Sequence, residues 1–528
     1  MFRLVKYYYY CKITLFDLQY YIFYNILLLI IYICMLLVVI FFIIRIEKDM
    51  KIPFIGRQQE LQTLSKLLKK NVASLVVIQG RRRIGKSRLV EEFAKNYTFY
   101  QFSGLPPVHE TTAQSERNEF SRQLAIQTKL PELYADDWNK LFILLADKVT
   151  TSRCIILFDE ISWIGSKDPD FLGKFKNAWD LYFKKNPKLL FILCGSVSSW
   201  IENNILSNTG FVGRISYRLT LDELPVQDCS KFWLKAGHYI SAYEKFKVLA
   251  VTGGIPRYLE EIKPELSAEE NIRDLCFIKG GALVNEFNDI FSDLFSTRSP
   301  TYKKIIQVLA NGAQDIKTIC NMLNIGQTGF ISEYLDNLMK SGFISRDYTW
   351  HITSGEVSKL SHFRLSDNYL RFYLKYIDKN RLRIENNEFT FKSLASLPGL
   401  ETIISLQFEN LVLKNRKYIK ECLYITPEEV ISDNPFFQKK TTRYPGCQID
   451  YLIQTKFGGL YICEIKFSKH PITYSIIDEV QKKLDRLYYP KGFSCRPVLI
   501  HVNGVHEDVI DSGFFAAIID FGNLLTAP

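Results

Sequence analysis

Short apolar runs alternate with amphipathic stretches through the part of the chain that follows residue 50. Three of these runs are almost wholly aliphatic or aromatic: Ser74–Ile78, Cys154–Phe158 and Leu189–Cys194. Such runs, when turn residues bound them, are typical of strands that are buried on both faces of a parallel sheet. The amphipathic stretches, such as Arg88–Ala94, predict helices. The alternation therefore predicts an α/β fold built on a doubly wound parallel sheet.

A complete phosphate-binding loop (P-loop) connects the first apolar run to its helix. It has the pattern G-x-x-x-x-G-K-S and reads Gly80-Arg81-Arg82-Arg83-Ile84-Gly85-Lys86-Ser87. The glycines allow a tight turn whose N–H groups face a β-phosphate, and the helix N-terminus adds partial positive charge. Lys86 is expected to reach the β- and γ-phosphates, and the Ser87 hydroxyl is expected to bind Mg²⁺. The loop therefore predicts ATP and Mg²⁺ as ligands.

Polar residues end the second and third apolar runs, at the edge of the sheet where ligands bind in such folds. Asp159 and Glu160 end the second run. We expect Asp159 to hold Mg²⁺ through its water shell and Glu160 to orient and deprotonate the attacking water. Ser196 follows the third run, where it could either sense the γ-phosphate or cap the next helix. Arg214 is a candidate arginine finger and Arg257 a candidate contact from a helical lid, with a surface salt bridge as the alternative for each.

Several short motifs together resemble a known family of ATPases. They are Phe54–Arg57, Gly80–Ser87, Phe102–Pro106, Phe158–Ile161, Leu193–Ser196, Gly253–Pro256 and Phe363–Tyr369. On these motifs, residues 50–528 resemble the AAA-type P-loop ATPases of the archaeal-ATPase group that carry a C-terminal domain called DUF234. The resemblance implies ATP binding and hydrolysis. The first 49 residues depart from the family pattern.

Three helices and two short strands are predicted in the middle of the chain. The helices are Tyr302–Ala310, Ile316–Leu323 and Thr328–Ser341, and the strands are Phe343–Arg346 and Trp350–Thr353. This order is that of a winged helix-turn-helix. The third helix has few of the residues that read base edges or bind phosphates. A module that packs against protein is therefore the preferred interpretation, with DNA reading as the alternative.

A hairpin near the C-terminus carries a second constellation of charged residues. Two alternating strands, Cys447–Ile453 and Leu460–Lys466, flank a glycine pair. Asp450 and Glu464 are expected side by side on one face, with Lys466 two residues further along the same face. Two carboxylates can hold Mg²⁺, and a lysine can position or activate water for attack on a phosphodiester.

Glu409, in the predicted helix Leu400–Leu413, is a further candidate acid for this metal site. The arrangement resembles the restriction-endonuclease-like PD-(D/E)xK core, as the C-terminal half of the family does. The pattern alone is weak, because Glu261–Lys263 and Asp315–Lys317 match its acid-x-Lys part as well. The alternative is an ordinary exposed hairpin in a domain that binds without cleaving.

The composition is that of a globular protein with several domains. The chain has 528 residues, of which 47% are hydrophobic and 23% charged, and its net charge of +11 permits contact with nucleic acid without requiring it. The 11 cysteines form no C-x-x-C pair, which predicts reduced thiols in a cytosolic protein. The 7 histidines show no zinc-ligand spacing. We therefore expect a cytoplasmic protein, with DNA and a second copy of the chain as candidate partners.

The first 49 residues allow two interpretations. Tyr20–Ile44 is almost purely apolar and long enough to span a bilayer as a single-pass anchor, with the ATPase in the cytosol. Residues 1–49 nevertheless contain no Ala, Gly, Ser, Pro or Trp, whereas membrane helices are comparatively rich in small residues. The alternative is that Met50 is the native start.

These predictions divide the chain into six parts. They are an apolar N-terminal segment (1–49), a P-loop ATPase core (50–225), a helical lid (226–297), a winged-helix-like part (298–360), a helical linker (361–399) and a nuclease-like α/β domain (400–528). The expected function is ATP hydrolysis coupled to a nuclease-like domain that acts on nucleic acid. The alternative is a nucleotide-dependent switch whose C-terminal domain only binds a protein or a nucleic acid.

Overall fold

The computed structural model describes residues 35, 53–106, 110–150, 152–196, 199–236, 240–295, 299–326, 329–389 and 393–526. The chain divides into two compact units, Met1–Phe54 and Ile55–Pro528, and the elements named below belong to the second. Met35 apart, the apolar segment Tyr20–Ile44 lies outside the described residues. Within the described ranges, no helix is both long and apolar enough to cross a membrane.

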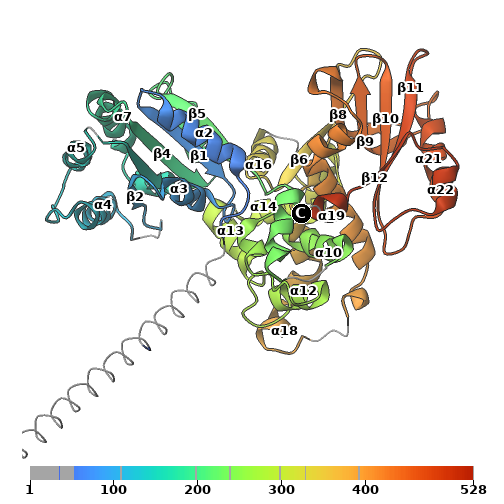
Figure 1. The fold of residues 1–528 in the computed structure, drawn as a ribbon, viewed down its shortest axis with the longest axis horizontal. Coiled ribbons are helices and arrows are strands. Elements are labelled where there is room, and N and C mark those ends of the chain that lie inside the picture. Colours follow the sequence, from blue (N-terminus) through green and yellow to red (C-terminus); the bar gives the residue numbers. More distant parts are fainter. Residues whose placement is uncertain are drawn as a thin grey trace, which may run out of the picture. The chain divides into compact units, whose positions relative to one another are not determined.

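A five-stranded parallel sheet forms the first half of this unit. The strand order is β2-β3-β4-β1-β5, and every neighbouring pair is parallel (Figure 1). Helices connect the strands, so the sheet is doubly wound and the expected fold class is confirmed. The strands are β1 (Ser74–Gly80), β2 (Thr98–Ser103), β3 (Cys154–Asp159), β4 (Leu189–Ser196) and β5 (Ile215–Leu221).

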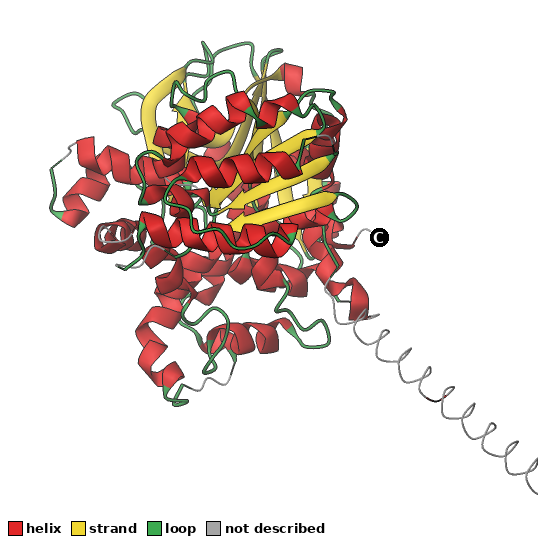
Figure 2. Cartoon of the chain, turned by 90° about the vertical axis from the view of Figure 1, so that its left-hand side faces the viewer, coloured by secondary structure: helices red, strands yellow, loops and turns green. Residues whose placement is uncertain are grey.

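Helices pack against both faces of the parallel sheet (Figure 2). On one face, Leu75 and Val77 share a core with α4, α5 and α7. Val76 and Ile78 are equally buried but alternate to the opposite face, where α3 packs against β1. Burial on both faces explains why the apolar runs have no polar positions. The helices are α2 (Gln58–Lys69), α3 (Lys86–Ala94), α4 (Ala113–Thr128), α5 (Trp138–Lys148), α6 (Ile161–Ser166), α7 (Phe171–Leu181), η1 (Phe183–Lys185), α8 (Ser199–Ile201) and η2 (Glu202–Leu206).

A group of helices follows the sheet in the chain. Ser241 caps α10, and Ser267 forms a capping box with Glu270 at α12, which fixes where these helices begin. Phe246 of α10 packs edge-on against Phe408 of the C-terminal part, so the two parts share one core. These helices are α9 (Val226–Cys229), η3 (Ser230–Ala236), α10 (Ala242–Thr252), α11 (Pro256–Leu259), α12 (Ala268–Cys276) and α13 (Glu286–Phe295).

Three helices and a two-stranded antiparallel sheet form the middle part. The prediction of a second strand at Trp350–Thr353 is wrong, because Trp350 is the last residue of β6. Its buried indole donates a hydrogen bond to Gln454 (2.6 Å), and this contact extends β6 beyond the predicted turn. The chain turns instead at Gly355, whose φ of +74° suits glycine. The elements are α14 (Ser299–Leu309), α15 (Ile316–Leu323), α16 (Gly329–Lys340), β6 (Ile344–Trp350) and β7 (Val357–Leu365).

The part of the chain predicted as a helical linker (361–399) begins with the end of β7 and continues as several short helical pieces. Asp367 caps the first piece by accepting a hydrogen bond from the backbone N–H of Leu370 (2.8 Å). A π-helical turn and a 3₁₀ turn then separate it from the next piece. The pieces are α17 (Asn368–Phe372), η5 (Tyr373–Ile377), η6 (Asp378–Asn380) and α18 (Arg381–Glu385), and η7 (Leu394–Ser396) follows.

The C-terminal part is built on a separate mixed sheet in the order β12-β11-β10-β9-β8. The pairs β8–β9 and β9–β10 are antiparallel, whereas β10–β11 and β11–β12 are parallel (Figure 1). Helix α19 packs on one face of the sheet, and α21 contacts β9. The elements are α19 (Leu400–Lys414), α20 (Arg416–Cys422), η8 (Pro427–Glu429), β8 (Val430–Gln438), β9 (Cys447–Thr455), β10 (Gly459–Phe467), α21 (Ser475–Arg486), β11 (Ser494–Val502), α22 (Glu507–Asp511), β12 (Ala517–Asp520) and α23 (Asn523–Thr526).

Candidate functional site

The P-loop folds around the side chain of its own lysine. Lys86 is the first residue of α3, and its Nζ donates to the carbonyl oxygens of Gly80 and Arg81, each at 3.2 Å. Gly85, just before it, has a φ of +88°, a conformation that favours glycine. The buried ammonium is therefore held inside the loop, in the position from which a P-loop lysine binds phosphate.

Ser87 and Asp159 meet at the carboxyl edge of the sheet. The Ser87 hydroxyl lies 2.6 Å from Oδ2 of Asp159, which is buried at the end of β3. Both are oxygen donors of the kind that Mg²⁺ prefers. Ser196 lies beside Gly80 in the β1–β4 register, and its buried hydroxyl has no hydrogen-bond partner among the described residues. A buried hydroxyl without a partner is costly, and both predictions for Ser196, the γ-phosphate contact and the helix cap, would supply one.

Glu160 follows β3 with an unusual backbone conformation. Its φ of +50° lies in the left-handed region, which non-glycine residues adopt rarely. The carboxylate of Asp159 accepts a hydrogen bond from the Glu160 N–H (3.1 Å), and the Glu160 carbonyl accepts one from Trp163 (2.8 Å). Such a conformation costs roughly 1–3 kcal/mol and persists where the surroundings hold it. These two hydrogen bonds thus fix the position of the Glu160 backbone at the edge of the sheet.

Arg81, the second residue of the loop, is buried and turned away from the lysine. It forms an ion pair with Asp367, lies 3.3 Å from the Tyr258 hydroxyl and sits over the Phe343 ring at 5.3 Å. Burial alone would lower the pKa of Arg81, yet the carboxylates of Asp367 and Glu223 raise it overall. The loop is therefore tied to segments that lie far from it in the sequence.

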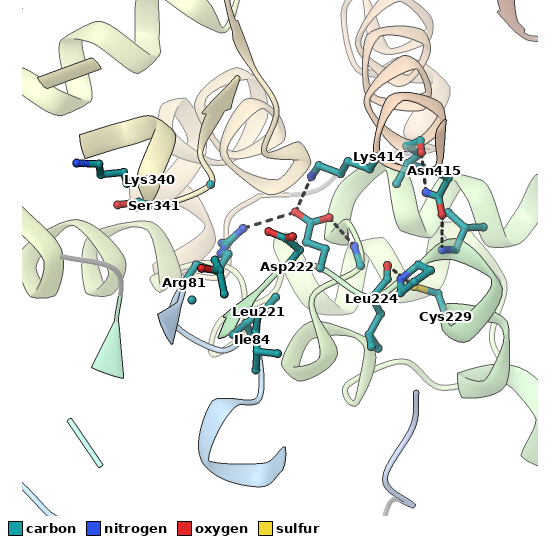
Figure 3. Close-up of a pocket in the computed structure, with 18 residues that line it drawn as sticks. Arg81, Ile84, Leu221, Asp222, Leu224, Cys229, Lys340, Ser341, Lys414 and Asn415 are labelled. Carbon is teal, nitrogen blue, oxygen red and sulfur yellow. Dashed lines mark hydrogen bonds and ion pairs between the residues drawn. The ribbon is translucent and has the colours of Figure 1, made fainter. Parts of the chain in front are cut away.

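Arg81 also lines a cavity of about 280 Å³ (Figure 3). Glu223 stands between two cations at its wall, 4.0 Å from Arg81 and 2.6 Å from Lys414 of α19. Its other carboxylate oxygen accepts from the Gly254 N–H (3.0 Å). Glu223 is the second residue after the end of β5, so this one side chain joins the end of the parallel sheet, the P-loop and the C-terminal part.

Arg83 binds the helices that follow the sheet. It donates to Glu286 of α13 (2.7 Å), which also accepts from the Tyr258 hydroxyl of α11 (3.0 Å). Arg82 stands between the two tied arginines and is half-buried, and the carbonyl oxygen of buried Ile84 accepts from Arg57 (3.3 Å). Each part of the loop is thus fixed by a neighbour.

Arg214 and Arg257 both form ion pairs with nearby acids. Arg214 binds Asp180 through two nitrogens, at 2.7 Å and 3.1 Å. Arg257 is half exposed and binds Glu260 (3.2 Å) and Glu261 (2.7 Å), one turn further along the chain. For both residues the structure has the salt bridges that the sequence left as the alternative.

The C-terminal constellation converges on one face of its sheet. The Lys483 ammonium of α21 lies 3.1 Å from Asp450 and 2.5 Å from Glu464. Lys466 binds the other oxygen of Glu464 (3.1 Å) and also Glu479 (2.8 Å). Because both carboxylates contact one nitrogen, Asp450 and Glu464 face each other. We call Asp450, Glu464, Lys466 and Lys483 the acid site.

The Asp450 carboxylate is fixed by the hairpin. The backbone pairing of β9 with β10 ends at Tyr451–Cys463. One residue further, the Asp450 side chain accepts the hydrogen bond of the Ile465 N–H (3.0 Å) in place of a backbone carbonyl. The aspartate therefore cannot rotate away from Glu464 without leaving that N–H unpaired.

Burial shifts the pKa values of acid-site residues and of Glu409, which interacts with Asp450. It raises the pKa of Glu409 to about 7, with the Asp450 charge adding to the effect, and burial and Asp450 also raise the pKa of Glu464. Burial alone would lower the pKa of Lys483, yet the two carboxylates raise it overall. Among the described residues, no group of three or more acids, histidines or cysteines has the arrangement of a metal site. The Lys483 ammonium lies between the Asp450 and Glu464 carboxylates, in the position that a shared metal ion would take.

Sequence reasoning missed Lys483. It comes 17 residues after Lys466 on a different element, and no motif of the hairpin points to it. The available signal was the position of α21, an amphipathic helix that directly follows the hairpin and must pack on it.

A short buried segment connects the two sites. Asn368, next to Asp367, donates to the carbonyls of Leu249 in α10 and Gln407 in α19, each at 3.2 Å. It accepts in turn from Asn410 (3.1 Å), while Gln407 donates to its backbone carbonyl (2.6 Å). Glu409 lies between these two α19 residues in the chain, and the acid-site residue Asp450 acts on its pKa.

Comparison with known proteins agrees with the geometry of the first site. Residues 54–262 match the family described as "ATPase domain predominantly from Archaea". The uncharacterized protein MJECL04 of Methanocaldococcus jannaschii is 27% identical over 345 residues, which are 65% of this chain and 72% of that protein. The uncharacterized ATP-binding protein MJ0423 of the same organism is 38% identical over 45 residues, which are 8% of this chain and 76% of that protein.

Among solved structures, the Walker-type ATPase PABY2304 of Pyrococcus abyssi is similar to 61% of this chain over 96% of its own length. The identity is 19% and the TM-score 0.46. The family match covers the P-loop, the end of β3 and the helices α9 to α11. Over residues 54–262, this chain is therefore similar to the ATPase domains of that family, and the P-loop and Asp159 lie within the matched residues.

Proposed function

We propose that the chain hydrolyses the β–γ phosphoanhydride bond of ATP at the site formed by Lys86, Ser87, Asp159 and Glu160. Lys86 binds the β- and γ-phosphate oxygens, and Glu160 accepts a proton from the water that attacks the γ-phosphorus. Ser87 and Asp159 would hold Mg²⁺, which when bound neutralises charge on the phosphate oxygens. The observation that carries the proposal is the 2.6 Å contact between Ser87 and Asp159, since it joins the loop to the end of β3.

Two substitutions test this assignment. Lys86→Ala removes the fixed partner of the phosphates and should abolish tight ATP binding. Glu160→Gln keeps the shape of the site but removes the base, so ATP should still bind while turnover stops. Binding is measured with a fluorescent ATP analogue and turnover by phosphate release. Equal turnover by the wild type and Glu160→Gln would refute the role of Glu160.

The contacts of the loop support a coupling between ATP turnover and the rest of the chain. Arg81 and Arg83 bind Asp367 and Glu286, which lie outside the parallel sheet. Each ion pair is formed by a residue of the P-loop. If a bound phosphate changes the conformation of the loop, the ion pairs must therefore change as well. We propose that ATP turnover rearranges the helices of residues 226–297 against the sheet.

For the C-terminal part, residues 400–528, we propose a nuclease-like domain of the DUF234 type that cleaves phosphodiesters in DNA. Asp450 and Glu464 would hold Mg²⁺, with Glu409 as a further acid, and Lys466 would position the attacking water. The observation that carries this proposal is that one ammonium nitrogen contacts both carboxylates. Asp450 and Glu464 thus lie close enough together, on one face of the sheet, to share a metal ion.

The test is a nicking assay on supercoiled DNA with Mg²⁺ or Mn²⁺. The wild type should nick the DNA, whereas Glu464→Gln and Lys466→Ala should not. Both variants should hydrolyse ATP as the wild type does, because the P-loop lies in a different part of the chain. Absence of nicking by the wild type under every metal would contradict the cleavage proposal.

A second candidate function has an observation of its own. Lys483 fills the space between the two carboxylates and neutralises them, as in a domain that kept its fold and binds a partner without cleaving. The chain would then be a nucleotide-dependent switch, and a second copy of the chain or DNA would be its partner. We retain the six-part division of the chain, with boundaries at 49, 225, 297, 360 and 399, as part of the proposal.

A further inference from the structure

A basic and aromatic surface lies next to the acid site, and the functions proposed above do not use it. All its side chains are exposed. They come from the loop between β8 and β9, from α21 and from the residues after α21. We call this surface the basic rim, and it consists of Lys439, Lys440, Arg443, Tyr444, Lys482, Arg486, Tyr488 and Tyr489.

The positive charges of the basic rim are uncompensated. Within the part of the chain that the structure describes, none of its five lysines and arginines forms an ion pair. The two nearby lysines of the acid site are different, because Lys466 and Lys483 each bind two carboxylates. Asp485, the acid of α21 that lies between Lys482 and Arg486 in the sequence, accepts a hydrogen bond from Gln481 instead (2.7 Å). Such a concentration of unpaired cations fits a polyanionic partner.

The aromatic part of the basic rim is held in place. The rings of Tyr444 and Tyr488 lie 4.1 Å apart, although the side chains are 37% and 48% exposed. Gln438 fixes the two segments: its amide nitrogen donates to the carbonyls of Pro445 (2.7 Å) and Arg486 (2.8 Å), and its oxygen accepts from the Tyr488 N–H (2.9 Å). The exposed rings therefore form a platform that is ordered before a partner binds, which reduces the entropy lost on binding.

Helix α21 joins the basic rim to the acid site. Lys482 and Arg486 belong to the rim, and Lys483 between them reaches Asp450 and Glu464. The start of β9 packs here too, since the Cys447 thiol contacts the Lys483 carbonyl (3.4 Å). A chain bound to Lys482 and Arg486 would therefore lie on the helix that carries Lys483.

We propose that the basic rim binds single-stranded nucleic acid and presents its phosphodiesters to the acid site. The proposal rests on the phosphodiesterase function given above. Lysines and arginines that track a backbone, combined with aromatic rings on which bases stack, are the features that bind single strands without sequence preference. A duplex offers the same phosphates, but its base faces are hidden in the stack and cannot reach Tyr444 and Tyr488.

The experiment measures binding separately from cleavage. Fluorescence anisotropy of a labelled dT20 strand is recorded with the full chain in EDTA, where no metal-dependent cleavage occurs. Tyr444→Ala/Tyr488→Ala should weaken binding roughly 5- to 150-fold, because a stacked base contributes about 1–3 kcal/mol. Lys439→Ala/Lys440→Ala/Arg443→Ala should reduce the slope of log affinity against log salt by about 2, because each phosphate that a cation neutralises adds about 0.7 to that slope.

Matched controls come from exposed residues of the ATPase part. Tyr134→Ala removes a side chain that is 73% exposed, and Lys69→Ala/Lys70→Ala removes two exposed charges. These variants should bind dT20 as the wild type does. All variants should retain ATP hydrolysis, which reports that the chain is folded.

The outcomes separate the proposals. Unchanged affinity in the rim variants would overturn the binding surface, and so would equal, tyrosine-independent binding of a 20-base-pair duplex. Weaker binding of the duplex supports a single strand, and a parallel titration with rU20 shows whether DNA or RNA is preferred. If dT20 binds through the rim but is never cleaved in Mg²⁺ or Mn²⁺, the phosphodiesterase proposal fails while the binding site stands.

Discussion

Replacing Asp367 by Asn should destabilise the chain by breaking the ion pair that ties the P-loop to α17. The Arg81 and Asp367 side chains are 5% and 1% exposed, so water cannot solvate the guanidinium that is left behind. Removal of one partner of a buried ion pair costs roughly 3–5 kcal/mol. Two features place Asp367→Asn near the lower end of that range. The amide oxygen can still accept the Leu370 N–H, and Glu223 at 4.0 Å compensates part of the Arg81 charge.

The measurement is a double-mutant cycle with Arg81→Met, read from urea unfolding. Residues in direct contact show coupling energies of about 0.5–3 kcal/mol, whereas distant residues are additive within roughly 0.3–0.5 kcal/mol. We expect the double variant to be little less stable than Asp367→Asn alone, since the methionine leaves no unpaired charge. Additive losses in the double variant would refute the reasoning. The control is the pair Arg257→Met and Glu261→Gln, which is 50% and 37% exposed and should contribute at most about 1 kcal/mol.

Three further predictions concern the two sites. Ser87→Ala should raise the Mg²⁺ concentration that gives half-maximal ATP hydrolysis, because one oxygen ligand is removed; an unchanged requirement would exclude Ser87 as a ligand. The pKa of Glu409 is raised by burial from 4.5 to about 7. Between these two pH values the folded chain therefore holds a proton on Glu409 that the unfolded chain has lost. The free energy of unfolding should consequently fall as pH rises from about 4.5 to 7. Glu409→Gln should remove this part of the pH dependence, as urea unfolding at pH 5 and pH 8 would show. Lys483→Met removes the cation between two carboxylates and should raise the apparent pKa of Glu464, measured by carboxyl NMR titration; an unchanged pKa would contradict the contact of 2.5 Å.

The ATPase fold and the core of its site could be predicted because their signals are local. The strand before the P-loop, the loop and the following helix are consecutive in the sequence, and so are β3 and Asp159-Glu160. The alternation of strands and helices predicts a parallel sheet, so the P-loop and Asp159-Glu160 are expected at the same edge of that sheet. The hairpin of Asp450 and Glu464 was predictable for the same reason, since a tight turn fixes which residues oppose each other.

The missed features depend on contacts between distant residues. Trp350 is held in β6 by Gln454, which lies 104 residues further along the chain. The partner of Arg81 lies 286 residues away. A pattern of three consecutive arginines in the loop does not show which of them is buried. Tertiary contacts determine which of the three arginines is buried. Tertiary contacts also give Arg214 and Arg257 their salt bridges, and a sequence alone cannot distinguish such salt bridges from catalytic contacts.

The buried polar groups of Asn368 explain why regions so far apart in the sequence form one compact unit. Its amide donates to backbone carbonyls of α10 and α19, and its own carbonyl accepts from Gln407. Buried polar groups have to be paired, so an apolar residue at this position would leave the groups of both helices unsatisfied. Asp367, one residue earlier, binds the P-loop in the same way. The short motif thus adds hydrogen bonds and an ion pair to the apolar core that α10 shares with the C-terminal part.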